Sequence, residues 1–244
     1  FYQWNPDGVT WGNGNLSWGH SVSVDLVNWF ALDAALQPSR PFDANGCWSA
    51  SATILPDGGS PVMLYTGIDH PDINYQVQNV AFPKNASDPL LVEWVKPSVN
   101  PVIPVPADIK RDDFRDPSTA CSARRPVAHR RRGPRPHCWG RTLIYRSKDF
   151  LRWERNADPL YLAHAAGMWE CPDFEPEWRF GSGERRRGEA RAQDERHGHG
   201  PGLLRGRELR RHGGHLRAGG RRRLPELRLD YGHVYASKTF FDSR

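Results

Sequence analysis

Short runs of β-forming residues, each ended by turn-forming residues, dominate the pattern of apolar and polar positions. Residues 60–66 (SPVMLYT), 76–82 (QVQNVAF) and 141–145 (RTLIY) are rich in β-formers and are bounded by Pro, Gly, Asp and Asn. Residues 55–59 (LPDGG) form a turn signal. No long segment has the apolar period of a helix, so the pattern predicts an all-β chain rather than a parallel α/β fold.

Tryptophan-rich motifs accompany these short strands, and the N-terminal third is also dense in Asn, Gln and Gly. Aromatic faces beside amide and hydroxyl groups suit sugar binding, although Trp and Tyr also fill the cores of β-sheets. Repeated short strands with such motifs are typical of a β-propeller, in which residues far apart in sequence meet at a central channel.

Two carboxylates stand in contexts that suit acid–base chemistry. Glu170 lies between Trp169 and Cys171, which solvate a charge poorly and so favour the protonated acid. Asp116 follows Arg115, whose charge favours the ionised form, and precedes a proline that restricts the backbone. One protonated and one ionised carboxyl are the catalytic groups of a glycosidase. Taken singly, the motifs also fit a surface Glu and a turn with a local ion pair.

The order of motifs along the chain resembles the plant acid invertases and fructan exohydrolases of glycoside hydrolase family 32. Pro172 after Glu-Cys resembles the cell-wall subgroup, since vacuolar members usually have Val there. The nine matching stretches are, in chain order, FYQWNP, WGNGNLSWGHSVSVDLVNW, WSASATILPDG, VMLYTG, QVQNVAFPKNASDPLLVEWVK, NPVI, DFRDPSTA, MWECPDF and LDYGHVYASKTFFD.

The resemblance implies a fold and a set of roles. The family fold is a five-bladed β-propeller followed by a β-sandwich; residues 1–244 correspond to part of the propeller catalytic domain, without the sandwich, so we expect poor stability from exposed edges. Glu170 corresponds to the acid/base and Cys171 tunes its pKa, while Asp116 is the transition-state stabiliser that holds fructose hydroxyls. The implied substrate-binding residues are Gln3, Trp11, Trp48, Ser49 and Arg115.

The implied activity is a retaining β-fructofuranosidase-type hydrolysis of sucrose or small fructans, without a cofactor. Ala50 replaces the usual Gly of the Trp-Ser-Gly-Ser run, which is a mild departure. The family's nucleophile is an Asp in a Trp-Met-Asn-Asp-Pro-Asn-Gly motif just upstream of the stretch that here begins at Phe1, and the printed residues contain no such motif. We therefore expect this polypeptide to be nearly inactive. The alternative is a non-catalytic pseudogene product or sugar-binding relic of the family.

The positive charge of the chain is concentrated in two arginine-rich blocks, residues 121–141 and 175–228. The 244 residues carry a formal net charge of +6. The blocks fit a nucleic-acid or heparin-binding tract, a disordered insert, or out-of-frame translation of GC-rich codons, which yields Arg, Gly, Ala, Pro and His. Family-like sequence resumes at residues 142–150 and 229–232, which favours the frame-shift hypothesis and makes a nucleic-acid binder the weakest class.

Two Asn-X-Ser sequons, at Asn15 and Asn85, predict glycosylation and, with the resemblance, a secreted cell-wall protein. No apolar run approaches the length of a membrane span, and no Cys/His spacing matches a metal site. The sequence thus predicts a small carbohydrate as partner, with no cofactor, metal, nucleic acid or membrane. It makes no prediction about oligomeric state. Cys47 and Cys171 are predicted to be thiols.

Overall fold

The computed structural model divides into two compact units, each of which is described by itself. Unit 1 comprises Phe1–Pro117 and Lys148–Trp153, and unit 2 comprises Ser118–Ser147 and Glu154–Arg244. Side chains are described within residues 1–119, 141–159 and 170–172, and elsewhere the backbone of strands alone. The residues that the structure describes are 1–9, 15–55, 59–70, 75–119, 124–132, 138–159, 161–164, 169–176, 190–196, 203–204, 209–212, 215–218 and 227–228.

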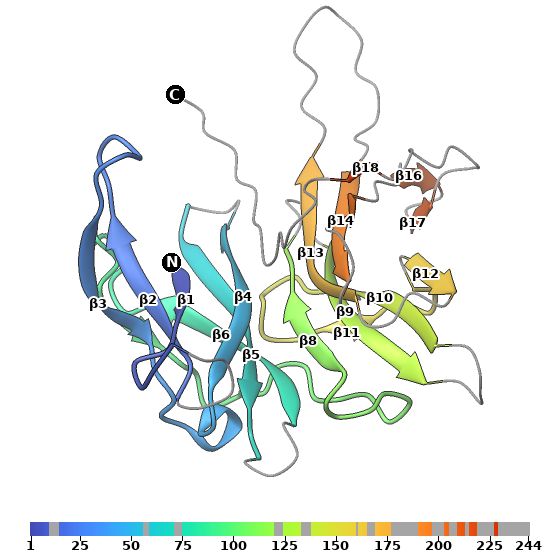
Figure 1. Ribbon diagram of the computed structural model, residues 1–244, viewed down its shortest axis with the longest axis horizontal. Coiled ribbons are helices and arrows are strands. Elements are labelled where there is room, and N and C mark those ends of the chain that lie inside the picture. The colour runs from blue at the N-terminus through green and yellow to red at the C-terminus, as the bar shows by residue number, and fades with distance from the viewer. Residues whose placement is uncertain are drawn as a thin grey trace, which may run out of the picture. The chain divides into compact units, whose positions relative to one another are not determined.

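Unit 1 opens with a three-stranded antiparallel sheet (Figure 1). Its strands are β1 (Tyr2–Trp4), β2 (Ser17–Val22) and β3 (Phe30–Leu36). The register places Gln3 of β1 opposite Trp18 of β2. The first sheet therefore brings the FYQWNP motif alongside the second tryptophan-rich motif.

The second sheet of unit 1 has four strands in the order β4-β5-β6-β7, joined in an antiparallel manner. These strands are β4 (Cys47–Ile54), β5 (Pro61–Ile68), β6 (Gln76–Pro83) and β7 (Trp94–Val95). The predicted strands at 60–66 and 76–82 are confirmed as β5 and β6. β4 and β5 pair on either side of the predicted turn at 55–59, and the Leu55 N–H donates to Ser60 O at 2.8 Å.

Strand β5 is buried along all eight of its residues, so the sheet is covered on both faces. Side chains alternate between the faces of a strand, and each face of β5 joins a different apolar cluster. Met63 and Tyr65 pack with Trp18, Leu36 and other residues of the first sheet. On the opposite face, Val62, Leu64, Val80 and Phe150 form the second cluster. Burial on both faces explains why this strand reads as a continuous apolar run in the sequence.

Strand β8 (Phe114–Pro117) completes unit 1, together with the one-turn 3₁₀ helix η1 (Pro41–Asp43). β8 packs against β4, β5 and β6. Its position is important for the site, because β8 carries Arg115 and Asp116.

Unit 2 is also built from antiparallel strands (Figure 1). β10 (Cys138–Arg146) pairs with β9 (Arg124–Arg132), β11 (Glu154–Arg155) and β12 (Tyr161–His164), which confirms the predicted strand at 141–145. Three further pairs follow along the chain: β13 (Trp169–Pro176) with β14 (Ala190–Arg196), β15 (Leu203–Leu204) with β18 (Leu227–Arg228), and β16 (Leu209–His212) with β17 (His215–Ala218).

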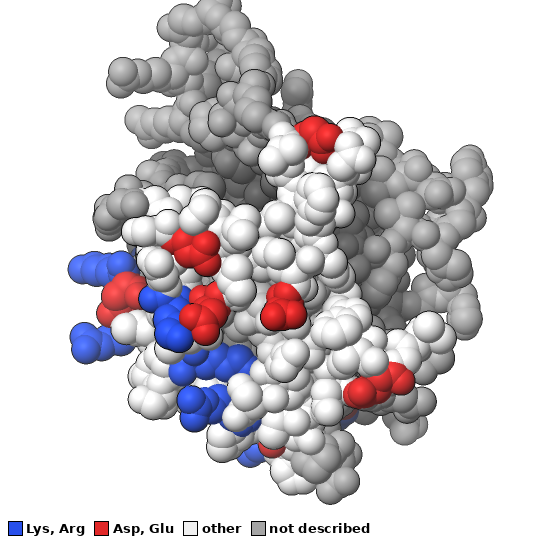
Figure 2. Space-filling model, turned by 90° about the vertical axis from the view of Figure 1, so that its left-hand side faces the viewer, with Lys and Arg blue, Asp and Glu red and all other residues white. Residues whose placement is uncertain are grey.

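The described residues are thus all-β, with one 3₁₀ turn, as the sequence pattern predicted. Strands β9 and β14 to β18 fall largely within the two arginine-rich blocks. On the face shown in Figure 2, the Lys and Arg side chains gather beside Asp and Glu, and much of the described surface is uncharged.

Candidate active site

Asp116 lies on β8 in a left-handed backbone conformation, with φ of 62°. Non-glycine residues rarely adopt this conformation, and Asp is among those that tolerate it best. The side chain is 5% exposed, and the backbone N–H donates to Thr66 Oγ1 at 3.1 Å. A left-handed, nearly buried Asp is held by its surroundings, which is common at functional sites.

The neighbouring Arg115 places a positive charge beside this carboxylate. Its Nε lies 3.8 Å from Asp116 Oδ2. The guanidinium is fixed by Nη1, which donates to Asp112 O at 3.1 Å and approaches Gln76 Oε1 at 3.4 Å. An opposite charge at this separation favours the ionised carboxylate over the neutral acid.

The side chain of Gln3 on β1 forms hydrogen bonds to strands β2 and β4 of unit 1. Its Nε2 donates to Ser17 O at 3.0 Å and to Cys47 O at 2.7 Å. Its Oε1 is buried and has no hydrogen-bond partner within the described part of the chain. Gln3 is therefore fixed through its nitrogen, while its oxygen remains able to accept a hydrogen bond from a hydroxyl group.

Trp48 and Ser49 lie at an irregularity in strand β4. Cys47 pairs with Gly67 and Ala50 with Tyr65, so the register shifts across the two residues between them. Such bulges redirect side chains and are frequent near active sites. The Trp48 carbonyl accepts from Trp18 Nε1 at 2.9 Å. Both Trp48 and Ser49 are half-buried, and their predicted role in substrate binding stays a prediction.

The conformation at Trp48 also depends on the residue two positions earlier. Gly46 has φ of 144°, in the region that favours glycine. A β-carbon there would approach Trp48 Nε1 to 2.8 Å. Any other residue at 46 would therefore be strained and would displace the indole ring.

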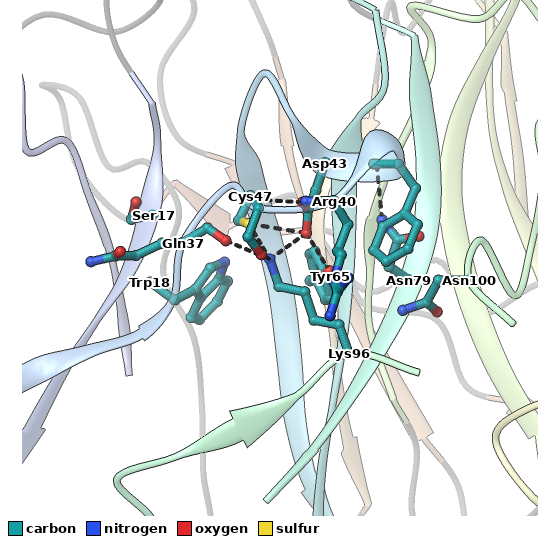
Figure 3. A network of polar contacts seen from close by, with 12 residues as sticks. Ser17, Trp18, Gln37, Arg40, Asp43, Cys47, Tyr65, Asn79, Lys96 and Asn100 are labelled. Atoms are coloured by element: carbon teal, nitrogen blue, oxygen red, sulfur yellow. Dashed lines mark hydrogen bonds and ion pairs between the residues drawn. The ribbon is translucent and has the colours of Figure 1, made fainter. Parts of the chain in front are cut away.

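A buried polar network stabilises the loop before β4 (Figure 3). Asp43 is fully buried and accepts from Tyr65 Oη at 2.7 Å and from Lys96 Nζ at 2.5 Å. Its other oxygen accepts from the N–H groups of Ser39 and Arg40, at 3.0 and 2.9 Å. Asp43 therefore ties the 3₁₀ turn to both β5 and the segment that follows β7.

Cys47 and Tyr65 take part in this network as protonated groups. Burial raises the pKa of the Cys47 thiol and the pKa of the Tyr65 hydroxyl above their ordinary values. Tyr65 consequently donates a hydrogen bond to Asp43 Oδ2, and the Cys47 Sγ lies 3.6 Å from the same oxygen. The network thus anchors β4 immediately before Trp48 and Ser49.

Glu170 lies in unit 2 on β13 and is 2% exposed. The register of β13 with β14 shifts between Glu170 and Asp173, so this carboxylate also stands at an irregularity. The next residue, Cys171, is half-buried and has φ of 47°. Glu170 is thus a buried carboxyl beside a left-handed residue, and its role as a general acid stays a prediction.

Unit 1 thus brings several predicted site residues together, since β1 bonds to β4 through Gln3 and β4 packs against β8. Glu170 and Cys171 belong to unit 2, and their convergence with Asp116 stays a prediction. Trp11 lies outside the described residues. Among the described residues, no group of three or more His, Cys, Asp or Glu could hold a metal ion. The described part also contains no helix that is long and apolar enough to cross a membrane.

Sequence reasoning missed the residues that support the site. Asp43 and Lys96 are 53 positions apart, so no local pattern links them. For Thr66, Gln76 and Gln78 a signal was present, because they are polar residues within strands predicted from otherwise apolar runs. Buried polar side chains require partners, and this requirement could have singled them out.

Comparisons with known proteins identify the relatives of this chain. The family model for the glycosyl hydrolases family 32 N-terminal domain matches residues 1–184. A fructan 6-exohydrolase of Triticum aestivum is 52% identical over 262 residues, covering 100% of this chain and 44% of that protein. The insoluble isoenzyme 7 of β-fructofuranosidase from Oryza sativa subsp. japonica is 50% identical, covering 100% of this chain and 42% of that protein.

Solved structures give the same result. Fructan 1-exohydrolase IIa from Cichorium intybus is similar with a TM-score of 0.81 and 39% identity, covering 99% of this chain and 46% of that one. A variant of the same enzyme was solved in complex with 1-kestose. The likeness confirms the predicted fold class, an all-β partial β-propeller. The chain spans less than half the length of these relatives.

Proposed function

Because the chain belongs to glycoside hydrolase family 32, we propose that it forms part of a β-fructofuranosidase-type hydrolase that acts on sucrose or small fructans. The observation that carries this proposal is the nearly buried Asp116, held in a left-handed conformation with Arg115 at 3.8 Å. The 1-kestose complex of the related chicory enzyme supports a fructose-containing oligosaccharide as the ligand.

The proposed reaction divides its steps among the named side chains. Glu170 protonates the leaving glycosidic oxygen, and its low exposure of 2% favours the acid form in which it can do so. Cys171 tunes this acid. Asp116 accepts hydrogen bonds from fructose hydroxyls in the transition state. Gln3 Oε1, which has no partner within the described residues, accepts from a further hydroxyl.

The remaining proposed contacts hold the sugar ring. Trp11 and Trp48 offer aromatic faces, and Ser49 offers a hydroxyl, at the pocket for the fructosyl unit. The printed residues contain no match to the family's nucleophile motif. We therefore propose that the polypeptide of these 244 residues, taken by itself, has little or no turnover, since a retaining glycosidase requires that carboxylate.

An extended protein would test the activity. The 244 residues, with blocks 121–141 and 175–228 replaced by the corresponding segments of the wheat fructan 6-exohydrolase, would be joined to the flanking segments of that enzyme, and release of fructose from sucrose and 1-kestose would be measured. We expect turnover in the extended protein. Glu170→Gln should lose at least about a hundredfold, by the usual scale for acid–base groups, and Asp116→Asn about as much, by the scale for groups that stabilise the transition state. Unchanged turnover in either variant would contradict the assigned role.

The unextended polypeptide would test the alternative of a sugar-binding relic. Titration calorimetry with sucrose, fructose and 1-kestose measures binding whether or not turnover occurs. Binding by the unextended chain, combined with no turnover in the extended protein, would favour the relic. Turnover by the unextended chain within tenfold of a full-length relative would refute its proposed inactivity.

Secretion to the cell wall and glycosylation are part of the same proposal. Asn85 and Asn15 are both exposed, and Asn85 Oδ1 accepts from the Ser87 N–H at 3.0 Å in a tight turn. Expression through a plant secretory pathway would show a mass shift on treatment with a glycosidase that removes N-linked glycans. Asn85→Gln should remove most of that shift, and an unaltered shift in Asn85→Gln/Asn15→Gln would contradict both sites.

A further inference from the structure

Three buried polar side chains on β5 and β6 contact strand β8. They are Thr66 on β5 and the pair Gln76 and Gln78 on β6, and their exposed fractions are 0%, 1% and 0%. Buried polar groups are hydrogen-bonded, so the groups they bind indicate their role. All three bind the backbone segment that carries Asp116.

The two glutamines fix the backbone of Phe114. Gln76 Oε1 accepts from the Phe114 N–H at 2.8 Å, and Gln78 Nε2 donates to Phe114 O at 2.8 Å. Both polar groups of this residue are thus bound by side chains of β6. These two bonds fix β8 against β6 at Phe114, two residues before Asp116.

Thr66 extends this set of contacts to Asp116 itself. Its Oγ1 donates to Gln78 Oε1 at 3.0 Å and accepts from the Asp116 N–H at 3.1 Å. A hydroxyl can donate only one hydrogen bond, and Thr66 donates it to Gln78 Oε1. The lone pairs of Thr66 are thereby directed to the Asp116 N–H.

These contacts explain how a left-handed Asp116 persists. Its φ of 62° is disfavoured for a residue with a side chain, and such conformations survive where the surroundings over-determine them. The direction of a side chain follows from the φ of its own residue. The contacts on either side of the Arg115 peptide therefore set the direction of the Asp116 carboxylate.

We propose that Thr66, Gln76 and Gln78 are positioning residues that hold the Asp116 carboxylate in its reactive orientation. The proposal rests on the proposed function, in which Asp116 contacts the fructosyl unit. In this role the three side chains act through the backbone that carries Asp116 rather than by binding the sugar themselves. A displacement of about 1 Å at a reacting group can cost on the order of a hundredfold in rate.

Kinetics of the extended protein provide the first test. Thr66→Val keeps the shape of the side chain and removes its hydroxyl, and we expect kcat to fall about tenfold or more with KM changed less than about threefold. Thr66→Ser keeps the hydroxyl and should restore kcat to within about threefold of the parent. The matched control is Thr142→Val, because the Thr142 hydroxyl is buried without a partner within the described residues. Equal kcat values for Thr66→Val and Thr142→Val would overturn the proposal.

A double variant separates positioning from a general loss of stability. In an Asp116→Asn background, Thr66→Val should lower kcat much less than in the parent, because its effect passes through Asp116. If Thr66→Val lowered kcat by the same factor in the parent and in the Asp116→Asn background, Thr66 would have a structural role only. If Thr66→Val does not fold, Gln78→Met, which removes the bond to Phe114 O and the acceptor of the Thr66 hydroxyl, replaces it in each comparison.

Crystal structures of the unextended chain and of its Thr66→Val variant give a readout that needs no activity. We expect φ at Asp116 to leave the left-handed region in the variant. An unchanged φ would overturn the positioning role even if the enzyme is active. Conversely, an extended protein without turnover would refute the proposed function. The positioning role would then be tested only by the φ of Asp116 in the two crystal structures.

Discussion

Lys96 and Asp43 form a buried ion pair that unites three segments of unit 1. The side chains are 7% and 0% exposed, and Lys96 Nζ also donates to Gln37 O and Ser39 Oγ. A buried pair costs desolvation free energy, so its net contribution is small, but the loss of one partner leaves a buried charge uncompensated. A buried ion-pair residue therefore matters for stability mainly because its removal leaves the charge of its partner buried and unpaired.

Lys96→Met should therefore lower the free energy of unfolding by about 3–5 kcal/mol, measured by urea denaturation. The matched control is Lys84→Met, because Lys84 and Glu93 form an ion pair at 2.9 Å with side chains 60% and 66% exposed. The control should change stability by at most about 1 kcal/mol. Equal effects of the two substitutions would contradict the importance of burial at Lys96.

His20 should make stability depend on pH. Burial lowers its pKa below the ordinary 6.5, and the residue is 3% exposed. Between the lowered pKa and about 6.5, the unfolded state binds the proton and the folded state does not, so stability rises with pH across this window. His20→Phe should reduce that slope, which for one proton is at most about 1.4 kcal/mol per pH unit. The free energy of unfolding of both proteins would be measured by urea denaturation from pH 5 to 8. The same dependence of that free energy on pH in both proteins would refute this expectation.

At the scale of elements, close packing between β5 and the 3₁₀ turn η1 depends on Gly67. A β-carbon at this position would overlap the Phe42 carbonyl and the side-chain amide of Asn79. The same amide donates to Phe42 O at 3.3 Å, so both neighbours are fixed. The turn that carries Asp43 can approach the sheet only because residue 67 has no side chain.

Gly67→Ala should accordingly destabilise the protein by about 1–3 kcal/mol, because neither neighbour can move without breaking a contact. Gly8→Ala is the matched control, since a β-carbon at Gly8 would meet no atom within 4 Å. The control should change the urea midpoint very little. If the two variants unfold at the same denaturant concentration, the packing argument at Gly67 is wrong.

At the scale of the whole molecule, the two arginine-rich blocks, residues 121–141 and 175–228, set the net charge. The strands assigned there leave the frame-shift hypothesis untested. We expect the gene and its transcripts to show shifted frames at both blocks and, once these are corrected, family-like sequence with far fewer arginines. The measurement is sequencing of the locus and its transcripts. A single uninterrupted frame through both blocks, shared by all transcripts, would contradict the hypothesis.

The sequence alone determined the fold class and the principal site candidates. Short runs of β-formers bounded by turn residues predicted strands β5, β6 and β10, because strand formation and turn chemistry are local properties. The Arg-Asp-Pro and Trp-Glu-Cys motifs indicated Asp116 and Glu170, because the residues that perturb a carboxylate are adjacent to it in the chain.

Only the tertiary structure decided how the site in unit 1 is supported. Local patterns say nothing of contacts such as Asp43 with Lys96, which form when distant segments pack together. Likewise, the left-handed φ of Asp116 and its bond to Thr66, 50 positions away, depend on how β8 packs against β5. Sequence specifies which side chains are present, whereas the burial and partners that give them a role arise from long-range packing of the sheets.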